Sequence, residues 1–86
     1  MTPAEFKFKT DLAFEVYKIK YGTYPNDLST DQATLEALRG QPGFTEVVNN
    51  CSNSYRGVPV GYVGGHTDWI RLRTETTNNY IHIMEI

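Results

Sequence analysis

Residues 2–22 read TPAEFKFKTDLAFEVYKIKYG, and this stretch decides the fold. Thr2 can cap a helix, a proline follows at the first helical turn, and Glu5 completes a Thr-x-x-Glu capping box. Gly22 suits the left-handed conformation that ends many helices. The sequence therefore predicts one long helix between these two signals, from about residue 3 to residue 21.

The apolar side chains of this helix form two adjoining stripes when residues are placed about 100° apart. The first stripe consists of Phe8, Leu12, Val16 and Ile19. The second, richer in aromatic rings, consists of Phe6, Ala13, Phe14, Tyr17 and Tyr21. A helix that packs on one sheet needs a single stripe, so we expect the first to cover the sheet and the second to lack a partner on it. Either another chain or the loop after the helix then covers the second stripe.

The clearly polar ridge of the helix consists of Lys7, Asp11, Glu15 and Lys18. Asp11 and Glu15 lie one helical turn apart between the two lysines. Nothing in the sequence would bury one carboxylate and raise its pKa. We interpret the pair as a solvated helix face and not as a catalytic acid and base.

The middle of the chain, from residue 22 to residue 54, is rich in turn residues. Tyr24-Pro25-Asn26-Asp27 predicts a turn, and Ser29 or Thr30 can cap a short helix that ends near Arg39. A short extended stretch is expected over residues 44–48. The segment is interpreted as a wrapped loop with one helical insert.

The last third, residues 55–86, predicts a β-meander. Val58 to Val63 is expected to be an edge strand because it contains Pro59 and Gly61, and Gly64-Gly65 predicts the hairpin turn that follows. Trp69 to Thr76 alternates between apolar and polar residues, as a half-buried strand does.

A second hairpin is predicted at Asn78-Asn79, before a last strand from Tyr80 to Ile86. If it closes on two or four residues, Ile70 and Leu72 share a face with two isoleucines of the last strand, Ile81 and Ile83. The whole chain is expected to be one α+β domain over residues 1–86, with the helix packed on a three- to four-stranded antiparallel sheet.

The composition and net charge of the chain disfavour some classes of function. The net charge of −2 and the isoelectric point near 5.5 disfavour general attraction to phosphate backbones or anionic lipid. The single cysteine, Cys51, excludes an internal disulfide. No apolar run reaches the roughly 18 to 20 residues of a membrane helix.

Residue types that could carry chemistry are few and scattered. Cys51 could pair with His66 or His82 as a thiol nucleophile, but nothing in the pattern brings them together. Two possible cation sites, His66 with Asp68 and Asp27 with Asp31, offer too few ligands. We expect no catalytic residues, no cofactor and no metal.

One patch is a candidate ligand-binding surface. It consists of Trp69, Arg71 and Arg73, which lie on one face of their predicted strand, and Tyr80 or His82 can lie beside them. Aromatic and guanidinium groups on a sheet face can bind single-stranded nucleic acid by stacking and phosphate neutralisation. A small nucleic-acid-binding module is therefore the alternative function.

Part of the chain resembles type IV pilins and type II secretion pseudopilins. The similar segments are Asp11 to Pro25, DLAFEVYKIKYGTYP, and the Leu-containing segment Asp31 to Leu38. They resemble the end of the long helix and the αβ loop of that family. The strands around Tyr62 and from Asp68 to Thr76 are similar to that family's meander.

The resemblance implies a structural subunit of a type IV pilus-like filament used in adhesion, motility, secretion or DNA uptake. Such subunits bundle their N-terminal helices. The resemblance therefore implies that the second stripe forms the filament interface. It also implies other pilin subunits as partners, an inner-membrane anchor on an apolar segment preceding residue 1, and a location at the cell surface, in the periplasm or in an extracellular filament. The chain lacks the calcium loop of major pseudopilins, which favours a pilin or minor pilin over that branch. It also departs from many Gram-negative pilins, because it lacks their paired cysteines and has Cys51 alone.

Overall fold

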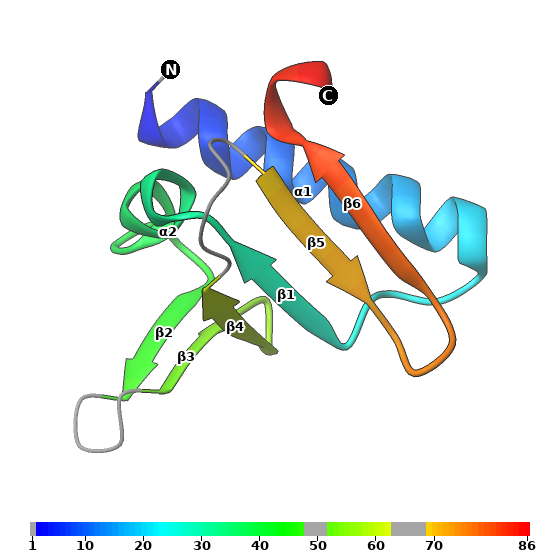
Figure 1. Cartoon of the computed structure of the whole chain (residues 1–86). Helices are drawn as coiled ribbons and strands as arrows, with labels where there is room; N and C mark the ends of the chain where they lie inside the picture. The colour runs from blue at the N-terminus through cyan, green and yellow to red at the C-terminus, as the bar shows by residue number, and fades with distance from the viewer. Residues whose placement is uncertain (1, 48–51, 63–68) are drawn as a thin grey trace.

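The computed structural model describes residues 2–47, 52–62 and 69–86. Two helices, a six-stranded sheet and a short 3-10 helix make up the described part (Figure 1). In chain order the elements are α1 (Pro3–Tyr21), β1 (Asp27–Thr30), α2 (Gln32–Leu38), β2 (Phe44–Val47), β3 (Ser52–Tyr55), β4 (Val58–Tyr62), β5 (Trp69–Arg73), β6 (Asn78–His82) and the 3-10 helix η2 (Ile83–Glu85).

Both ends of α1 confirm the predicted caps. The Thr2 hydroxyl accepts a hydrogen bond from the Glu5 backbone N–H at 3.2 Å, and the Glu5 carboxylate accepts one from the Thr2 N–H at 3.3 Å. Gly22 is left-handed, with φ of 81°, and its N–H donates to the Lys18 carbonyl at 2.8 Å. The helix covers the predicted residues because these local signals are complete.

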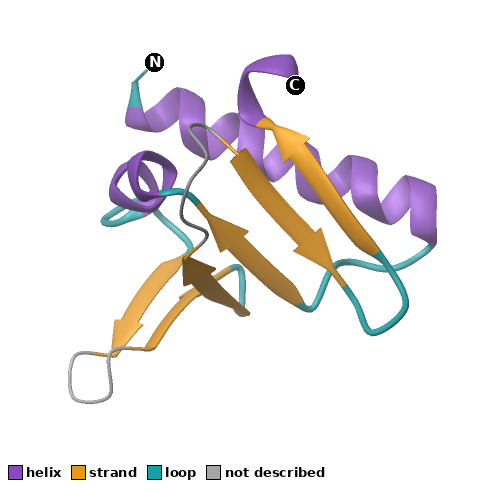
Figure 2. Ribbon diagram, in the orientation of Figure 1, coloured by secondary structure: helices purple, strands orange, loops and turns teal. Residues whose placement is uncertain are grey.

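The predicted α+β class is confirmed: α1 lies across one face of the sheet (Figures 1 and 2). The strand order is β2-β3-β4-β1-β5-β6, so the described sheet has six strands and not three or four. It is also mixed, because β1 pairs with β4 in parallel while the other neighbours are antiparallel. The chain makes that parallel pair by crossing over through α2, β2 and β3.

Strand β1 lies at the centre of the sheet in a segment for which the sequence predicts a turn and a helix cap. Leu28 pairs with Val60 on one side and with Leu72 on the other. Thr30 belongs to this strand and does not cap α2, which begins after Asp31. The predicted cap positions are therefore wrong, since two-sided pairing outweighs the weak strand propensity of this sequence.

Strand β4 is an interior strand between β3 and β1, not the predicted edge strand. Pro59 is accommodated because the ladder with β1 begins only at Val60. The β3–β4 hairpin turns at Arg56 and Gly57, whose φ values of 53° and 77° are both positive. Two consecutive positive φ values are typical of a type I′ turn, which suits the twist of a hairpin.

The β5–β6 hairpin confirms the predicted shared face but moves the turn. Ile70 pairs with Ile81, and residues 74–77 form a four-residue connection. Asn78 and Asn79, the predicted turn, instead begin β6. The predicted last strand ends at His82, after which η2 places Ile83 in the core at 0% exposure.

The two stripes of α1 are exchanged relative to the prediction. The second stripe faces the sheet: Phe6, Ala13, Phe14 and Tyr17 are all less than 10% exposed, and Tyr21 packs against the same core. The expectation that this stripe lacks a partner within the chain is therefore wrong. The first stripe, Phe8, Leu12, Val16 and Ile19, is the exposed one.

Thr10 explains part of this exchange. It lies on the buried face, and its hydroxyl donates to the Phe6 carbonyl at 2.8 Å, which satisfies the polar group within the helix. Small Thr10 and Ala13 side chains also let the helix approach the sheet closely. The Tyr17 hydroxyl reaches the Thr77 hydroxyl at the edge of the core, so a tyrosine can be buried there.

Candidate interaction surface on helix α1

The exposed face of α1 carries four large apolar side chains. Phe8 is 64% exposed, Leu12 38%, Val16 54% and Ile19 85%. At 100° per residue these positions lie almost opposite the buried face of the same helix, and not beside it as predicted. The helix is thus apolar on two sides, and its own sheet covers only one.

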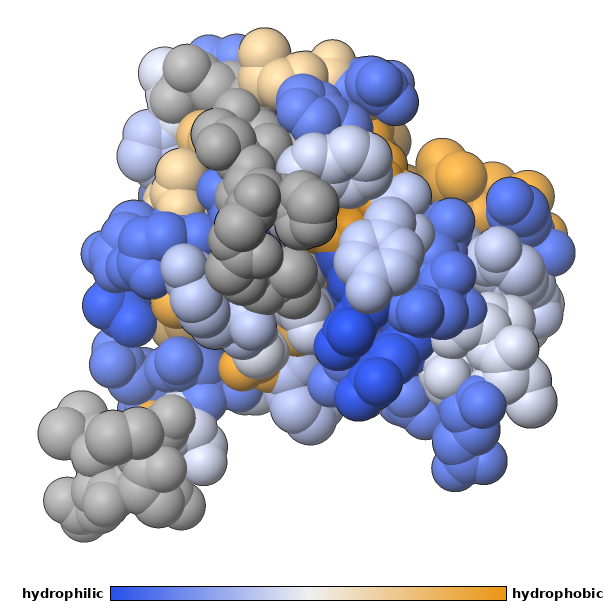
Figure 3. Space-filling view, in the orientation of Figure 1, coloured by the Kyte–Doolittle hydropathy of each residue, from blue (hydrophilic) through white to orange (hydrophobic). Residues whose placement is uncertain are grey.

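An apolar hollow of about 430 Å³ extends this face towards β6. Its lining comes from α1 and from the C-terminal end of the chain, and consists of Leu12, Ala13, Val16, Ile81, Glu85 and Ile86. Figure 3 shows hydrophobic surface emerging at the right-hand margin, the side on which β6 and α1 lie in Figure 1. The exposed helix face and the edge of the sheet therefore share one apolar surface.

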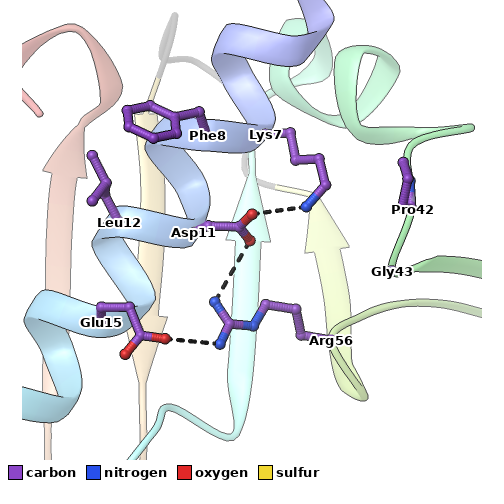
Figure 4. Close-up of a pocket in the computed structure, with 8 residues that line it drawn as sticks. All are labelled: Lys7, Phe8, Asp11, Leu12, Glu15, Pro42, Gly43 and Arg56. Atoms are coloured by element: carbon purple, nitrogen blue, oxygen red, sulfur yellow. Dashed lines mark hydrogen bonds and ion pairs between the residues drawn. The ribbon is translucent and has the colours of Figure 1, made fainter.

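The other flank of the exposed face is a charged cluster that joins α1 to the β3–β4 turn (Figure 4). Lys7 Nζ donates to Asp11 Oδ2 at 2.7 Å. Arg56 pairs with Asp11 at 3.5 Å and donates to Glu15 Oε1 at 3.0 Å. A hollow of about 450 Å³ lies here, but its charged side chains are already paired with one another.

Arg56 has a fold role that the sequence pattern does not reveal. Its guanidinium carbon lies 5.0 Å from the centre of the Phe14 ring and 5.4 Å from that of Tyr24. The arginine therefore anchors the hairpin turn to the polar ridge of α1. Asp11 and Glu15 remain at the surface, as predicted, but they bind this arginine and not solvent alone.

Tyr55 lies beneath this cluster with no exposed surface and donates its hydroxyl proton to Asp11 Oδ1 at 2.6 Å. Burial of the ring, and then this hydrogen bond, raise the pKa of Tyr55 to about 12. Both favour the neutral phenol, so ionisation of Tyr55 opposes folding.

Alkaline pH should therefore destabilise the protein. The pKa of Tyr55 is raised above the unfolded value of about 10. The stabilisation that the neutral Tyr55 phenol gives the folded state is therefore complete below about pH 10 and is lost as the pH rises through about 12. We expect a loss of roughly 1 to 2 kcal/mol, less than the full shift because charged neighbours and solvent screen it. Urea unfolding at several pH values measures the free energy of unfolding. The variant Tyr55→Phe should lose less stability at alkaline pH, because it has no phenol to ionise. An equal alkaline loss in Tyr55→Phe would show that Tyr55 is not its source.

The patch predicted to bind nucleic acid exists as a face of β5, but its arginines are paired within the chain. Trp69 stands opposite His82 and Arg71 opposite Tyr80, as the alternation predicts. However, Arg73 Nε lies 2.9 Å from an Asp27 carboxylate oxygen, and Arg71 Nη2 lies 3.6 Å from the same oxygen. One carboxylate thus offsets much of the positive charge that a phosphate would need.

The residues weighed for catalysis or metal binding do not assemble in the described part of the chain. Asp27 and Asp31 lie at opposite ends of β1, with Asp27 held by the two arginines. Cys51, His66 and Asp68 lie outside the described residues. No group of three or more His, Cys, Asp or Glu side chains suited to a metal occurs in residues 2–47, 52–62 and 69–86.

No family model, curated protein or solved structure matches this chain. Within the described segments, no helix has both the length and the apolar character needed to cross a membrane. The exposed face of α1, and the hollow beside it, are the features of the described surface that most need a functional explanation. The sequence reveals the two stripes, but it offers no signal for which of them is exposed.

Proposed function

We propose that this protein is a structural subunit of a type IV pilus-like filament and that it assembles through the exposed face of α1. The observation that carries the proposal is the exposure of Phe8, Leu12, Val16 and Ile19 on the side of α1 opposite its own core. A helix of this kind can pack on its own sheet and against neighbouring subunits at once.

The energetics favour assembly over solvation of this face. Burying a large aliphatic or aromatic side chain contributes about 1.5 to 3 kcal/mol relative to full exposure. Four partly exposed side chains on one face therefore offer several kcal/mol to a partner. A contiguous apolar surface of this kind is typical of a binding site.

The filament assignment rests on the resemblance of the α1 end and the following turn to type IV pilins. In that family the helices are bundled at the centre of the filament and the globular parts lie outside. The proposal includes related pilin subunits as partners, a membrane anchor before assembly and a place in an extracellular filament or at the cell surface. It includes no catalytic activity and no cofactor.

Polar replacement of the exposed face should weaken association. In the double variant Phe8→Gln/Ile19→Gln, we expect open-ended, concentration-dependent assemblies to require at least about tenfold more protein, since one factor of ten corresponds to about 1.4 kcal/mol. Glutamine keeps helix propensity, so the fold should persist. Sedimentation velocity over a concentration series measures the effect.

The matched control is Val47→Gln/Tyr62→Gln, which replaces exposed apolar side chains away from α1. These residues are 46% and 62% exposed, so the polarity change is comparable. Assembly should be unchanged in the control. Equal weakening in both variants, or a wild-type chain that forms nothing larger than a dimer, would refute the helix-face proposal.

A further inference from the structure

Strand β6 is an open edge of the sheet. In the described strand order it has β5 on one side and no strand on the other. Its five residues, Asn78 to His82, include no proline, lysine or carboxylate. Natural edge strands commonly carry such residues to prevent pairing with another chain.

The hydrogen-bonding groups that face this open edge can be assigned from the turn. The Thr74 N–H donates to the Thr77 carbonyl at 3.1 Å, which makes them a hydrogen-bonded pair. Such pairs alternate along an antiparallel ladder, so Asn79 and Ile81 bond to β5. The backbone groups of the alternate residues point outward, and these residues are Asn78, Tyr80 and His82.

The β1 side of β5 supports this assignment independently. The Arg73 carbonyl accepts from the Asn26 N–H at 3.0 Å, and the Trp69 carbonyl accepts from the Asp31 N–H at 3.2 Å. Arg73 and Trp69 stand opposite Asn78 and His82, respectively. Because their carbonyls bond away from β6, the residues opposite them must also direct their backbone groups away from β5.

We propose that β6 pairs antiparallel with β6 of a second copy of this chain, centred on Tyr80. In this register Tyr80 faces Tyr80 of the second copy, and Asn78 faces His82 of the second copy. All outward-facing residues of both strands then meet as hydrogen-bonded pairs. A shift by one residue would oppose outward groups to inward ones, so the strand is self-complementary in this register.

The surroundings of the edge fit a second copy. The apolar hollow lined by Leu12, Val16 and Ile81 lies beside β6, and the dyad places the hollows of two copies side by side. The net charge of −2 per chain opposes pairing only weakly.

This dimer goes beyond the filament proposal and does not depend on it. The exposed face of α1 and the hollow beside β6 have Leu12 and Val16 in common.

The test removes one outward N–H without touching the internal ladder. Tyr80→Pro deletes a donor that does not bond to β5, whereas Tyr80→Thr keeps the donor and changes only the side chain. We expect the dimer dissociation constant from sedimentation equilibrium to rise at least about tenfold in Tyr80→Pro and to stay within about threefold in Tyr80→Thr. Circular dichroism checks that both variants fold.

Two charged substitutions of Tyr80 provide a second test if Tyr80→Pro does not fold. Tyr80 is 49% exposed, so Tyr80→Lys and Tyr80→Glu should fold. Each should dimerise poorly alone, because like charges meet at the dyad, and an equimolar mixture should form a heterodimer. A wild-type chain that stays monomeric, or a mixture that does not associate, would overturn the proposal, as would a dimer lost in Phe8→Gln/Ile19→Gln but kept in Tyr80→Pro.

Discussion

Phe14→Ala should lower the free energy of unfolding by about 3 to 5 kcal/mol, the usual cost of removing a buried phenylalanine ring. Phe14 is 1% exposed and packs edge-on against Tyr55, with ring centres 6.0 Å apart. It also supports the Arg56 guanidinium. A small domain is stable by only about 5 to 15 kcal/mol, so the variant should be close to unfolding at body temperature. Urea denaturation followed by circular dichroism measures the loss.

Phe8→Ala is the matched control, because it makes the same change on the same helix. Phe8 is 64% exposed and leaves no closed cavity when shortened. We expect the free energy of unfolding to change by no more than about 0.5 kcal/mol, as for most surface substitutions. If Phe8→Ala were the more damaging of the two, the orientation of α1 on the sheet would be wrong.

Leu28→Ala should cost about 2 to 5 kcal/mol, although it changes a strand of only four residues. Leu28 has no exposed surface, and β1 pairs in parallel with β4 on one side and antiparallel with β5 on the other. A cavity at this position weakens contacts to both neighbouring strands. Chemical denaturation gives the free energy, and hydrogen exchange of β1 amides should accelerate with it.

Leu12→Ala is the corresponding control for leucine. Leu12 is 38% exposed, so truncation should cost less than about 1 kcal/mol in the monomer. Equal losses for the two leucines would show that β1 is not a central strand. The same control variant is informative for assembly, because Leu12 lines the apolar hollow.

The difference between the two stripes of α1 has a simple origin. Both stripes have comparable apolar content, so hydrophobic periodicity cannot rank them. The choice depends on shape: Ala13 and Thr10 permit close packing, and Tyr17 finds hydroxyl partners at the end of the β5–β6 hairpin. Those partners are about sixty residues away in the chain and cannot be seen in a local pattern.

The sheet illustrates the same limit. The alternation from Trp69 to Arg73 and the isoleucines near the C-terminus predict β5, β6 and the face that Ile70 shares with Ile81. The predicted turn at Asn78-Asn79 gives a different register, so the observed pairing of Ile70 with Ile81 does not follow from it. Strand β1 has one apolar residue among four and carries no such signal. It is a strand because β4 and β5 supply hydrogen bonds on both of its sides.

The sequence by itself determined the features that depend on neighbouring residues: the bounds of α1, set by the Thr2 and Glu5 capping box and by Gly22, the α+β class, and the face that Trp69, Arg71 and Arg73 share. Only the tertiary structure decided which face of α1 is buried, where β1 lies, and that β6 is an open edge. Caps and alternation are local interactions of a few residues. Burial and strand neighbours depend on contacts between distant segments, whose free energies exceed the local preferences.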